Sequence, residues 1–475
     1  MSNYPAYLSY YLREFAGVST ATFRVPPQAS ATLDAHKQMS FRLPTNTLVS
    51  CKDIRLVFSA STTDNGSSKA ARLPKASALI ERIIVTAGGI QIDSGVQNQN
   101  ALTQALDNMK VRKHDPVDSH SEMYRKVSGV NAADFGGGDG AAGNTSAEKY
   151  DSLNNATQFA VSLGNFFETV SPNLLDLSLM PEVVVTVHLA GNSVITSGKG
   201  CLAADGDDCF TKPGDAQATY TVSNYQLLVP CYSLDDGFMY QKVIQTRMAD
   251  TGYLTCSWTG YDAFSDTFSG VTRCASAASS LDKIIAVFRD DGYTGRNGAI
   301  PIAGMNDGLA QSERSVSALD QSDARGMNYL SAPMNFTAPM ADLPDAASAL
   351  NGSAPEVRQE PELGFALNSV RYPQFNATLS QWYQLTKDAF EVPSTQSKSY
   401  MEYLSNRFVM AIRLNLPQSQ ALRAKSGLDL RGSNSSILLS NTSGVATKAN
   451  SNVLMFLEST KELRLGAGKT LQVIL

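Results

Sequence analysis

Two short motifs carry residue types that catalyse reactions in other proteins. The segment Arg464-Leu-Gly-Ala-Gly-Lys469-Thr470 has the glycines, lysine and hydroxyl of a phosphate-binding loop, but that motif requires a glycine where Leu463 stands and a helix after the lysine. A tight turn into a final strand is the better prediction. Ser280 and Lys283 have the Ser-x-x-Lys spacing of penicillin-binding proteins, yet residues 284–288 that follow are strand-like rather than helical. We therefore predict no catalytic residue and no enzyme.

Possible metal ligands occur in three polar stretches. His114 and His120 flank an acidic segment, and carboxylates cluster at Asp205-Gly-Asp-Asp208 and Asp290-Asp291. Clustered carboxylates in turns suit calcium at a subunit seam, but solvated loops are the preferred interpretation. The cysteines contain no Cys-x-x-Cys pair, which favours buried thiols over a zinc site. They are Cys51, Cys201, Cys209, Cys231, Cys256 and Cys274. We predict no metal and no cofactor.

Length and composition limit the class of protein. A chain of 475 residues and 50.9 kDa is too long for one ordinary core, so two or three domains are expected. The net charge is -5, and the sequence lacks the clusters of Lys and Arg that binding of specific or wrapped nucleic acid requires. No apolar run reaches the roughly 20 residues of a membrane-spanning helix, and no secretion signal precedes the first strands. We expect a globular protein kept in a reducing compartment.

The first 19 residues predict an amphipathic helical arm. Its apolar residues recur at helical spacing and line one face: Tyr4, Tyr7, Leu8, Tyr11, Leu12 and Phe15. Two interpretations stay open. The helix packs on its own domain, or it docks on a neighbouring subunit, an accessory protein or a lipid surface.

From about residue 20 the hydrophobic period changes to two, which predicts half-buried strands. A Gly88-Gly89 pair between β-branched runs predicts a tight hairpin. A helix ending near Met109 should follow it, capped by Asn98 or Asn100. Residues 111–156 predict a long loop insertion. The alternating run Val183–Leu189 then closes a first β half, which we assign to residues 20–195.

A polar bridge at 196–216 predicts a linker, and residues 217–475 predict a second β half. Tyr220–Val229 is its expected opening strand, and 290–361 is a second loop insertion. Thr378-x-x-Gln381 matches a capping box, so a helix with Trp382 on its buried face should follow. Both halves thus share an order of elements without sharing sequence.

Four features together resemble one known family. They are the turn Leu177-Ser-Leu-Met-Pro181, the closing strand Val183–Leu189, the strand Thr221-Val-Ser-Asn-Tyr-Gln-Leu-Leu228, and Arg371-Tyr-Pro-Gln-Phe375 before a helix. The chain resembles the double jelly-roll major capsid proteins of tailless double-stranded DNA viruses, of the virophage and polinton-like type. The resemblance implies an all-β chain of two tandem eight-stranded jelly-roll β-sandwiches, with short helices and long loop insertions.

The resemblance also implies a function. We expect a virion structural protein, assembled inside the host cell, whose pseudo-hexameric homotrimers tile an icosahedral capsid around a double-stranded DNA genome. Its expected partners are further copies of itself, penton and minor or cement capsid proteins, and an internal membrane reached by the N-terminal arm. Candidate interface residues are Tyr4, Tyr7, Tyr11 and Phe15 of the arm and Met327, Met334, Phe336 and Met340 of the second loop.

Two other classes of function stay open at this point. A carbohydrate-binding or receptor-binding β-sandwich protein needs an exposed aromatic platform. The chain has two tryptophans for it, Trp258 and Trp382, and Trp382 is better explained as a helix anchor. A glycosidase needs paired acidic residues on inward-facing strands, whereas most carboxylates here fall in expected loops.

Overall fold

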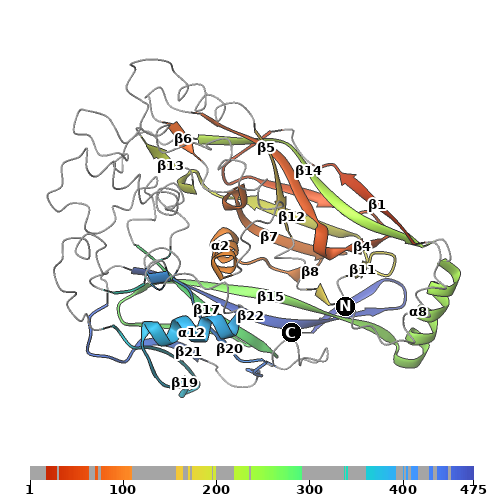
Figure 1. Cartoon of the computed structure of the whole chain (residues 1–475). Coiled ribbons are helices and arrows are strands. Elements are labelled where there is room, and N and C mark those ends of the chain that lie inside the picture. Colours follow the sequence, from red (N-terminus) through yellow and green to blue (C-terminus); the bar gives the residue numbers. More distant parts are fainter. Residues whose placement is uncertain are drawn as a thin grey trace, which may run out of the picture.

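The computed structural model describes most of the expected strands and the helices between them. The described residues are 18–28, 32–63, 70–72, 76–109, 157–163, 170–171, 174–194, 196–198, 219–234, 237–290, 336, 338–340, 360–391, 400, 403–404, 408–415, 427–431, 436–447 and 451–474. Figure 1 shows two pairs of β-sheets lying side by side, with helix α2 (Gln99–Met109) between the pairs.

The first pair of sheets closes with a strand from beyond the expected boundary. Sheet I has the order β11-β4-β14-β5-β9, and β1 and β2 also pair with β14. Sheet II has the order β3-β12-β7-β8. The bounds are β1 Val18–Val25, β2 Thr32–Asp34, β3 Gln38–Arg42, β4 Leu48–Ser50, β5 Arg55–Thr63, β7 Ile80–Ala87, β8 Ile90–Asp93, β9 Thr157–Ser162, β11 Leu174–Asp176, β12 Val183–Leu189 and β14 Thr219–Leu234.

The second pair of sheets uses eight successive strands. Sheet III has the order β15-β22-β17-β20, with β10 and β23 attached, and sheet IV has the order β16-β21-β18-β19. The bounds are β10 Val170–Ser171, β15 Tyr253–Phe268, β16 Val271–Ala275, β17 Leu281–Asp290, β18 Leu363–Leu367, β19 Val370–Ala377, β20 Met410–Arg413, β21 Ser436–Asn441, β22 Ser451–Gly466 and β23 Thr470–Ile474.

The strand order identifies both halves as jelly rolls. In the second half the first, eighth, third and sixth strands form sheet III, and the second, seventh, fourth and fifth form sheet IV. The first half has the same order when β1 and β2 count as its first strand and β14 as its eighth. Two four-stranded sheets interleaved in this way are the double Greek key of a jelly roll. The expected fold class is therefore confirmed.

The expected division between the halves is wrong in one respect. The linker is expected at 196–216 and the second half from 217, but β14 pairs with β1, β2, β4 and β5 of the first roll. Within the former linker, β13 (Thr196–Gly198) pairs with β6 (Ala70–Arg72). The connection between the rolls is instead helix α8 (Gly237–Thr251), which sequence reasoning missed. Strand partners lie far along the chain, so an apolar run alone does not reveal its sheet.

Several local predictions are confirmed. Strand β12 alternates buried and half-buried residues along its length. Gly88 and Gly89 take positive φ of 57° and 83° in the hairpin between β7 and β8. Thr378 and Gln381 form the expected capping box of α12 (Leu379–Ala389). Strands β18 and β19 form a second hairpin, with Asn368 and Ser369 at positive φ in its turn.

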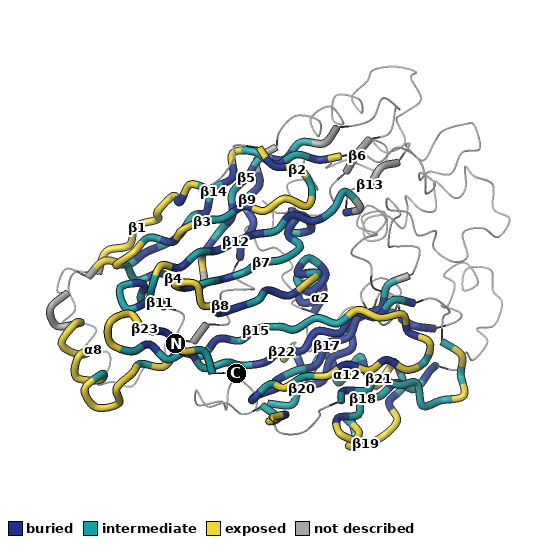
Figure 2. The backbone as a smooth tube through the Cα atoms, turned by 180° about the vertical axis from the view of Figure 1, so that it is seen from behind, coloured by how far each residue is buried: buried dark blue, intermediate teal, exposed yellow. Residues whose placement is uncertain are grey.

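Three apolar clusters hold the molecule together. One fills the first roll, including Phe41, Phe58 and Tyr225, and extends to Trp258 and Leu463 of sheet III. A second fills the other roll around Phe288 and Trp382. The third lies between the rolls, where α2 covers the outer face of sheet III. Figure 2 shows buried backbone along α2, β17 and β22, with exposed backbone on β1 and α8. We call this third cluster the seam.

Candidate functional site

The predicted interface residues do not form a surface in the described part of the chain. Tyr4, Tyr7, Tyr11, Phe15, Met327 and Met334 lie outside the described residues. Phe336 is 0% exposed and Met340 is 5% exposed. Phe336 packs in the seam and Met340 in the second roll, so the prediction that these two face another subunit is wrong. The chain's own core buries them because this short segment threads beside Leu404 and Phe408.

The catalytic-looking motifs have structural roles. Residues Ala467 to Lys469 form the turn between β22 and β23, with Gly468 at φ 73°, as predicted. Ser280 donates a hydrogen bond to Asp282 at 2.9 Å, whereas Lys283 pairs with Glu458. Their side chains thus serve different partners. His114, His120 and residues 205–208 lie outside the described part.

Metal ligation and thiol chemistry find little support in the described segments. Within them, no group of three or more His, Cys, Asp or Glu side chains is placed to hold a metal ion. Cys51, Cys231, Cys256 and Cys274 are free and buried. Burial raises the pKa of Cys51 to about 12 and that of Cys256 to about 11. Such thiols stay protonated at neutral pH and are poor nucleophiles.

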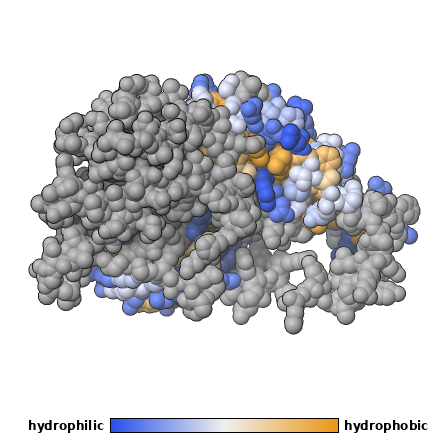
Figure 3. All heavy atoms as spheres, turned by 45° about the horizontal axis from the view of Figure 1, so that its top comes forward, coloured by the Kyte–Doolittle hydropathy of each residue, from blue (hydrophilic) through white to orange (hydrophobic). Residues whose placement is uncertain are grey.

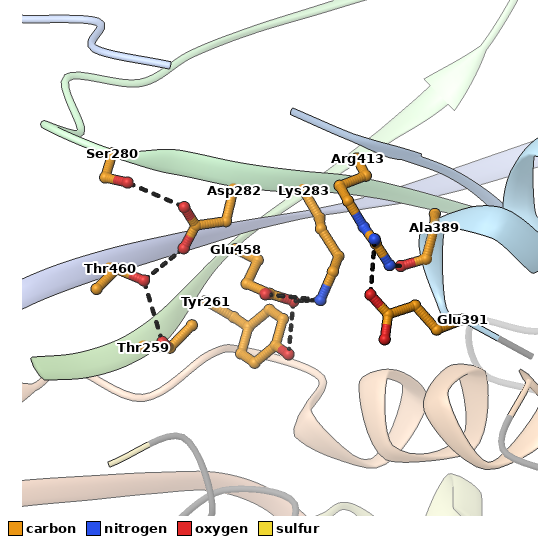
Figure 4. A network of polar contacts seen from close by, with 10 residues as sticks. All are labelled: Thr259, Tyr261, Ser280, Asp282, Lys283, Ala389, Glu391, Arg413, Glu458 and Thr460. Carbon is orange, nitrogen blue, oxygen red and sulfur yellow. Dashed lines mark hydrogen bonds and ion pairs between the residues drawn. The ribbon is translucent and has the colours of Figure 1, made fainter. Parts of the chain in front are cut away.

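A buried network of ionisable groups crosses sheet III (Figure 4). The Nζ atom of Lys283 lies 2.9 Å from Oε1 and 3.2 Å from Oε2 of Glu458. The Tyr261 hydroxyl donates to Oε2 of Glu458 at 3.0 Å. The two charged side chains are only 14% and 8% exposed. Burial, followed by the nearby carboxylate of Glu458, raises the pKa of the Tyr261 hydroxyl well above its usual value.

Asp282 extends the network through a β-bulge. The pairing of β17 with β22 shifts register between Leu281 and Lys283, which leaves Asp282 as the extra residue. Its carboxylate accepts hydrogen bonds from Ser280 and Thr460, and Thr460 is 3.1 Å from Thr259. Burial raises the pKa of Asp282 despite these hydrogen bonds.

A second ion pair ties α12 to the edge of sheet III. Nη1 of Arg413 lies 2.8 Å from Glu391, and Nη2 donates at 2.8 Å to the carbonyl of Ala389, the last residue of α12. A guanidinium at a helix C-terminus satisfies a free carbonyl and complements the helix dipole. Arg413 therefore fixes the end of α12 on β20.

The rolls also share a buried polar contact. Asp93, at the end of β8, accepts hydrogen bonds from the indole Nε1 of Trp258 at 2.8 Å and from the backbone of Gly95 at 2.9 Å. Burial raises the pKa of this carboxyl, although both hydrogen bonds and nearby Lys461 oppose the shift. The contact joins the fifth strand of one roll to the first strand of the other.

The buried carboxylates could suggest the paired acids of a glycosidase, but their contacts are structural. Asp93, Asp282 and Glu458 are 3%, 4% and 6% exposed, and each already accepts hydrogen bonds from fixed donors. A glycosidase pair needs room for a sugar and a water between its acids. Trp258 and Trp382 are both 0% exposed, so neither offers a sugar-stacking platform. The hydrogen bonds of these carboxylates hold neighbouring strands in place.

A partly exposed apolar surface lies elsewhere, on sheet I. On the outer face of β14, Leu228, Pro230 and Tyr232 are only half-buried, beside Val57 of β5. At the edge of the same sheet, Phe23 of β1 is 45% exposed. Figure 3 shows apolar atoms at the surface among hydrophilic ones on the side of the molecule that carries these strands. Sequence reasoning missed this surface, although the continuous apolar run 227–232 was a signal for it.

Comparisons with known proteins agree with the topology. No protein-family model and no curated protein matches the sequence. Among solved structures, the PBCV-1 virus capsid has a TM-score of 0.53 at 13% identity, and PBCV-1 VP54 fitted into a reconstruction of the virophage Sputnik has 0.54 at 13%; both cover 96% of each chain. The Faustovirus major capsid protein has a TM-score of 0.53 at 10% identity, covering 98% of this chain and 92% of the other. The chain has the fold of these double jelly-roll proteins.

Proposed function

We propose that this chain is the major capsid protein of an icosahedral virus with a double-stranded DNA genome, and that it forms pseudo-hexameric homotrimers. One observation carries the proposal. Two rolls of identical strand order are locked side by side by α2, in a fold shared along nearly its whole length with the PBCV-1 and Faustovirus capsid proteins.

The geometry explains how such a chain makes a shell. Two similar rolls in one subunit place six roll positions in a ring of three copies, which is close to six-fold symmetry. A head-to-tail contact of this kind closes into a ring when its rotation permits. The buried ionic network and the apolar seam make each subunit a rigid unit for such a ring.

Further partners belong to the same proposal. We infer that the trimers contact penton and minor or cement capsid proteins, and that the protein resides in the virion after assembly inside the host cell. The arm expected over residues 1–19 is shorter by two, because Val18 and Ser19 belong to β1; we infer that residues 1–17 lie at the inner end, against minor proteins or an internal membrane. No helix in the described ranges is long and apolar enough to cross a membrane.

The mass of the purified protein tests the proposal. Size-exclusion chromatography with light scattering should give about three times the 50.9 kDa of one chain, and negative-stain images should show hexagonal outlines. A protein that stays monomeric at micromolar concentration and binds immobilised glycans would replace the proposal with a carbohydrate-binding or receptor-binding role.

A further inference from the structure

Helix α8 is tied to the first roll, but most of its surface is open. The hydroxyl of Tyr240 donates a hydrogen bond of 2.7 Å to Asp176 at the end of β11, which fixes α8 beside sheet I. Tyr240, Ile244 and Met248 follow one another by a turn of helix and are half-buried. The side chains between them are exposed, and Val243 is 53% exposed. A helix with so narrow a buried stripe has room for a further layer on its surface.

Sheet I continues this open surface. Its register places four residues in one row across β1, β14, β4 and β11: Thr20, Tyr232, Leu48 and Asp176. Opposed residues of antiparallel strands share a face of the sheet, so Tyr232 and Leu48 lie on the face that Tyr240 of α8 reaches. Both are half-buried. Leu174, two residues before Asp176 and on the same face of β11, is 46% exposed.

These side chains form one partly exposed apolar surface beside α8. Val243 belongs to it because it follows Tyr240 by three residues, and such residues are neighbours on a helix. We call this set the α8 surface: Leu48, Leu174, Tyr232, Tyr240 and Val243.

The N-terminal arm begins at this surface. Strands β1 and β14 are antiparallel and Val18 pairs with Leu234, so the chain before Val18 and the chain after Leu234 leave sheet I at the same end. The hydroxyls of Ser19 and Ser233 lie 2.6 Å apart there, and α8 begins shortly after Leu234 (Figure 1). Residues 1–17 lie outside the described residues, but their covalent bond to Val18 starts the arm next to α8.

The arm suits the α8 surface in length and in chemistry. As a helix its 17 residues would span about 25 Å at 1.5 Å per residue, and the 15 residues of α8 span about 22 Å. An isolated helix of this length is marginal in water, so it needs an apolar surface to pack on. The apolar stripe of the arm consists of Tyr4, Tyr7, Leu8, Tyr11, Leu12 and Phe15. The α8 surface offers leucine, valine and tyrosine side chains where the arm starts.

We propose that the apolar stripe of the arm packs on the α8 surface of its own chain. The own chain is favoured over another copy because the arm is joined to β1, which gives it an effective concentration on the order of millimolar at this surface. This inference rests on the proposed function for the place of the arm at the inner end, and it assigns the apolar stripe to the chain itself. The opposite face of the arm, which carries Arg13, is then the face left for minor capsid proteins.

Hydrogen exchange of the purified protein tests this contact. The purified chain carries neither lipid nor minor proteins, so any protection of the arm must come from the protein itself. The backbone amides of residues 1–17 should exchange at least about tenfold more slowly than those of a free peptide of the same sequence, as measured by mass spectrometry. An arm that exchanges as fast as the free peptide would overturn the inference, because its stripe would then be free for a membrane or another protein.

Substitutions on both sides of the contact locate it. Leu174→Glu and Val243→Glu place a carboxylate in the α8 surface and should each remove the protection of the arm. Val271→Glu is the matched control and should leave the arm protected, because Val271 is 54% exposed on β16 of sheet IV. Within the arm, Leu8→Glu should also remove the protection, whereas Ala6→Glu, on the opposite face of the expected helix, should not.

Two controls complete the experiment. Circular dichroism melting confirms that each variant is folded, and folded variants of Leu174, Val243 and Leu8 that keep a protected arm would contradict the named surface. In protein assembled from isotopically heavy and light chains, carbodiimide joins carboxylates to amines, such as Glu14 of the arm and Lys242 of α8. Cross-linked peptides of a single label support contact within one chain, and peptides of mixed label overturn it.

The mass of the wild type separates this inference from the proposed function. A trimeric wild type with an unprotected arm contradicts the arm contact alone. A monomeric wild type contradicts the proposed function, and the exchange of residues 1–17 still decides whether the arm packs on α8.

Discussion

Trp258 donates its indole hydrogen bond to Asp93, a residue 165 positions earlier in the chain and in the other jelly roll. Both side chains are buried. The contact lies outside the apolar seam and adds a directional constraint between the rolls, because a hydrogen bond to a buried carboxylate is lost if the rolls slide. Rigid placement of the two rolls is what the proposed head-to-tail ring requires.

Removing the indole N–H donor of Trp258 should destabilise the protein more than removing the indole N–H donor of Trp382. Trp258→Phe leaves the Asp93 carboxylate buried with one donor fewer, and hydrogen bonds to charged groups contribute about 1.5–3 kcal/mol. Trp382→Phe is the control, because Trp382 donates at 2.8 Å to the neutral carbonyl of Leu363. Urea unfolding at pH 7 should show the larger loss for Trp258→Phe. Equal losses would contradict a special role for the Asp93 contact.

The Asp93 carboxyl should make the folded protein more stable toward acid. Burial raises its pKa above the ordinary 3.8, so the folded state binds this proton more tightly than the unfolded state. The contribution is fully present below the ordinary pKa and is lost as pH rises through the raised one. The unfolding free energy of the wild type minus that of Asp93→Asn should therefore increase from pH 7 to pH 4. A decrease would mean that Lys461 and the hydrogen bonds outweigh burial.

Breaking the Lys283–Glu458 pair should cost far more than breaking an exposed pair. Lys283→Met leaves a carboxylate that is 8% exposed without its cation, and such losses are about 3–5 kcal/mol. Arg431→Met is the control, since Arg431 and Asp429 are 56% and 51% exposed and an exposed pair adds little to stability. Thermal or urea unfolding measures both. A small effect of Lys283→Met would show that water reaches Glu458.

Gly95 should tolerate no side chain in the turn before α2. It has φ 68°, and an added Cβ would lie 2.1 Å from the carbonyl oxygen of Ile83. Gly468 shares the left-handed backbone, with φ 73°, but has open space around it. Gly468→Ala should cost about 1–2 kcal/mol from the backbone conformation, and Gly95→Ala should cost more because the backbone must also move. Melting temperatures of the two variants provide the comparison.

Local sequence patterns predicted the elements that local physics controls. The capping box at Thr378 and Gln381 depends on residues three apart, and the Gly88-Gly89 hairpin depends on two adjacent glycines that accept positive φ. The alternation of Val183–Leu189 places one side of β12 in the core. Helix α8 was missed because its side chains are largely exposed, so it lacks the periodic apolar face that identifies a helix.

The sequence by itself determined that the chain folds into two β halves with a helix in each, because side-chain period, capping and turn chemistry act over a few residues. The tertiary structure decided that β14 closes the first roll, that Phe336 and Met340 face the core, and that Lys283 meets Glu458 from 175 residues away. These outcomes depend on which distant surfaces bury one another. Sheet pairing and burial are set by the whole packed molecule, and no short window of sequence contains that information.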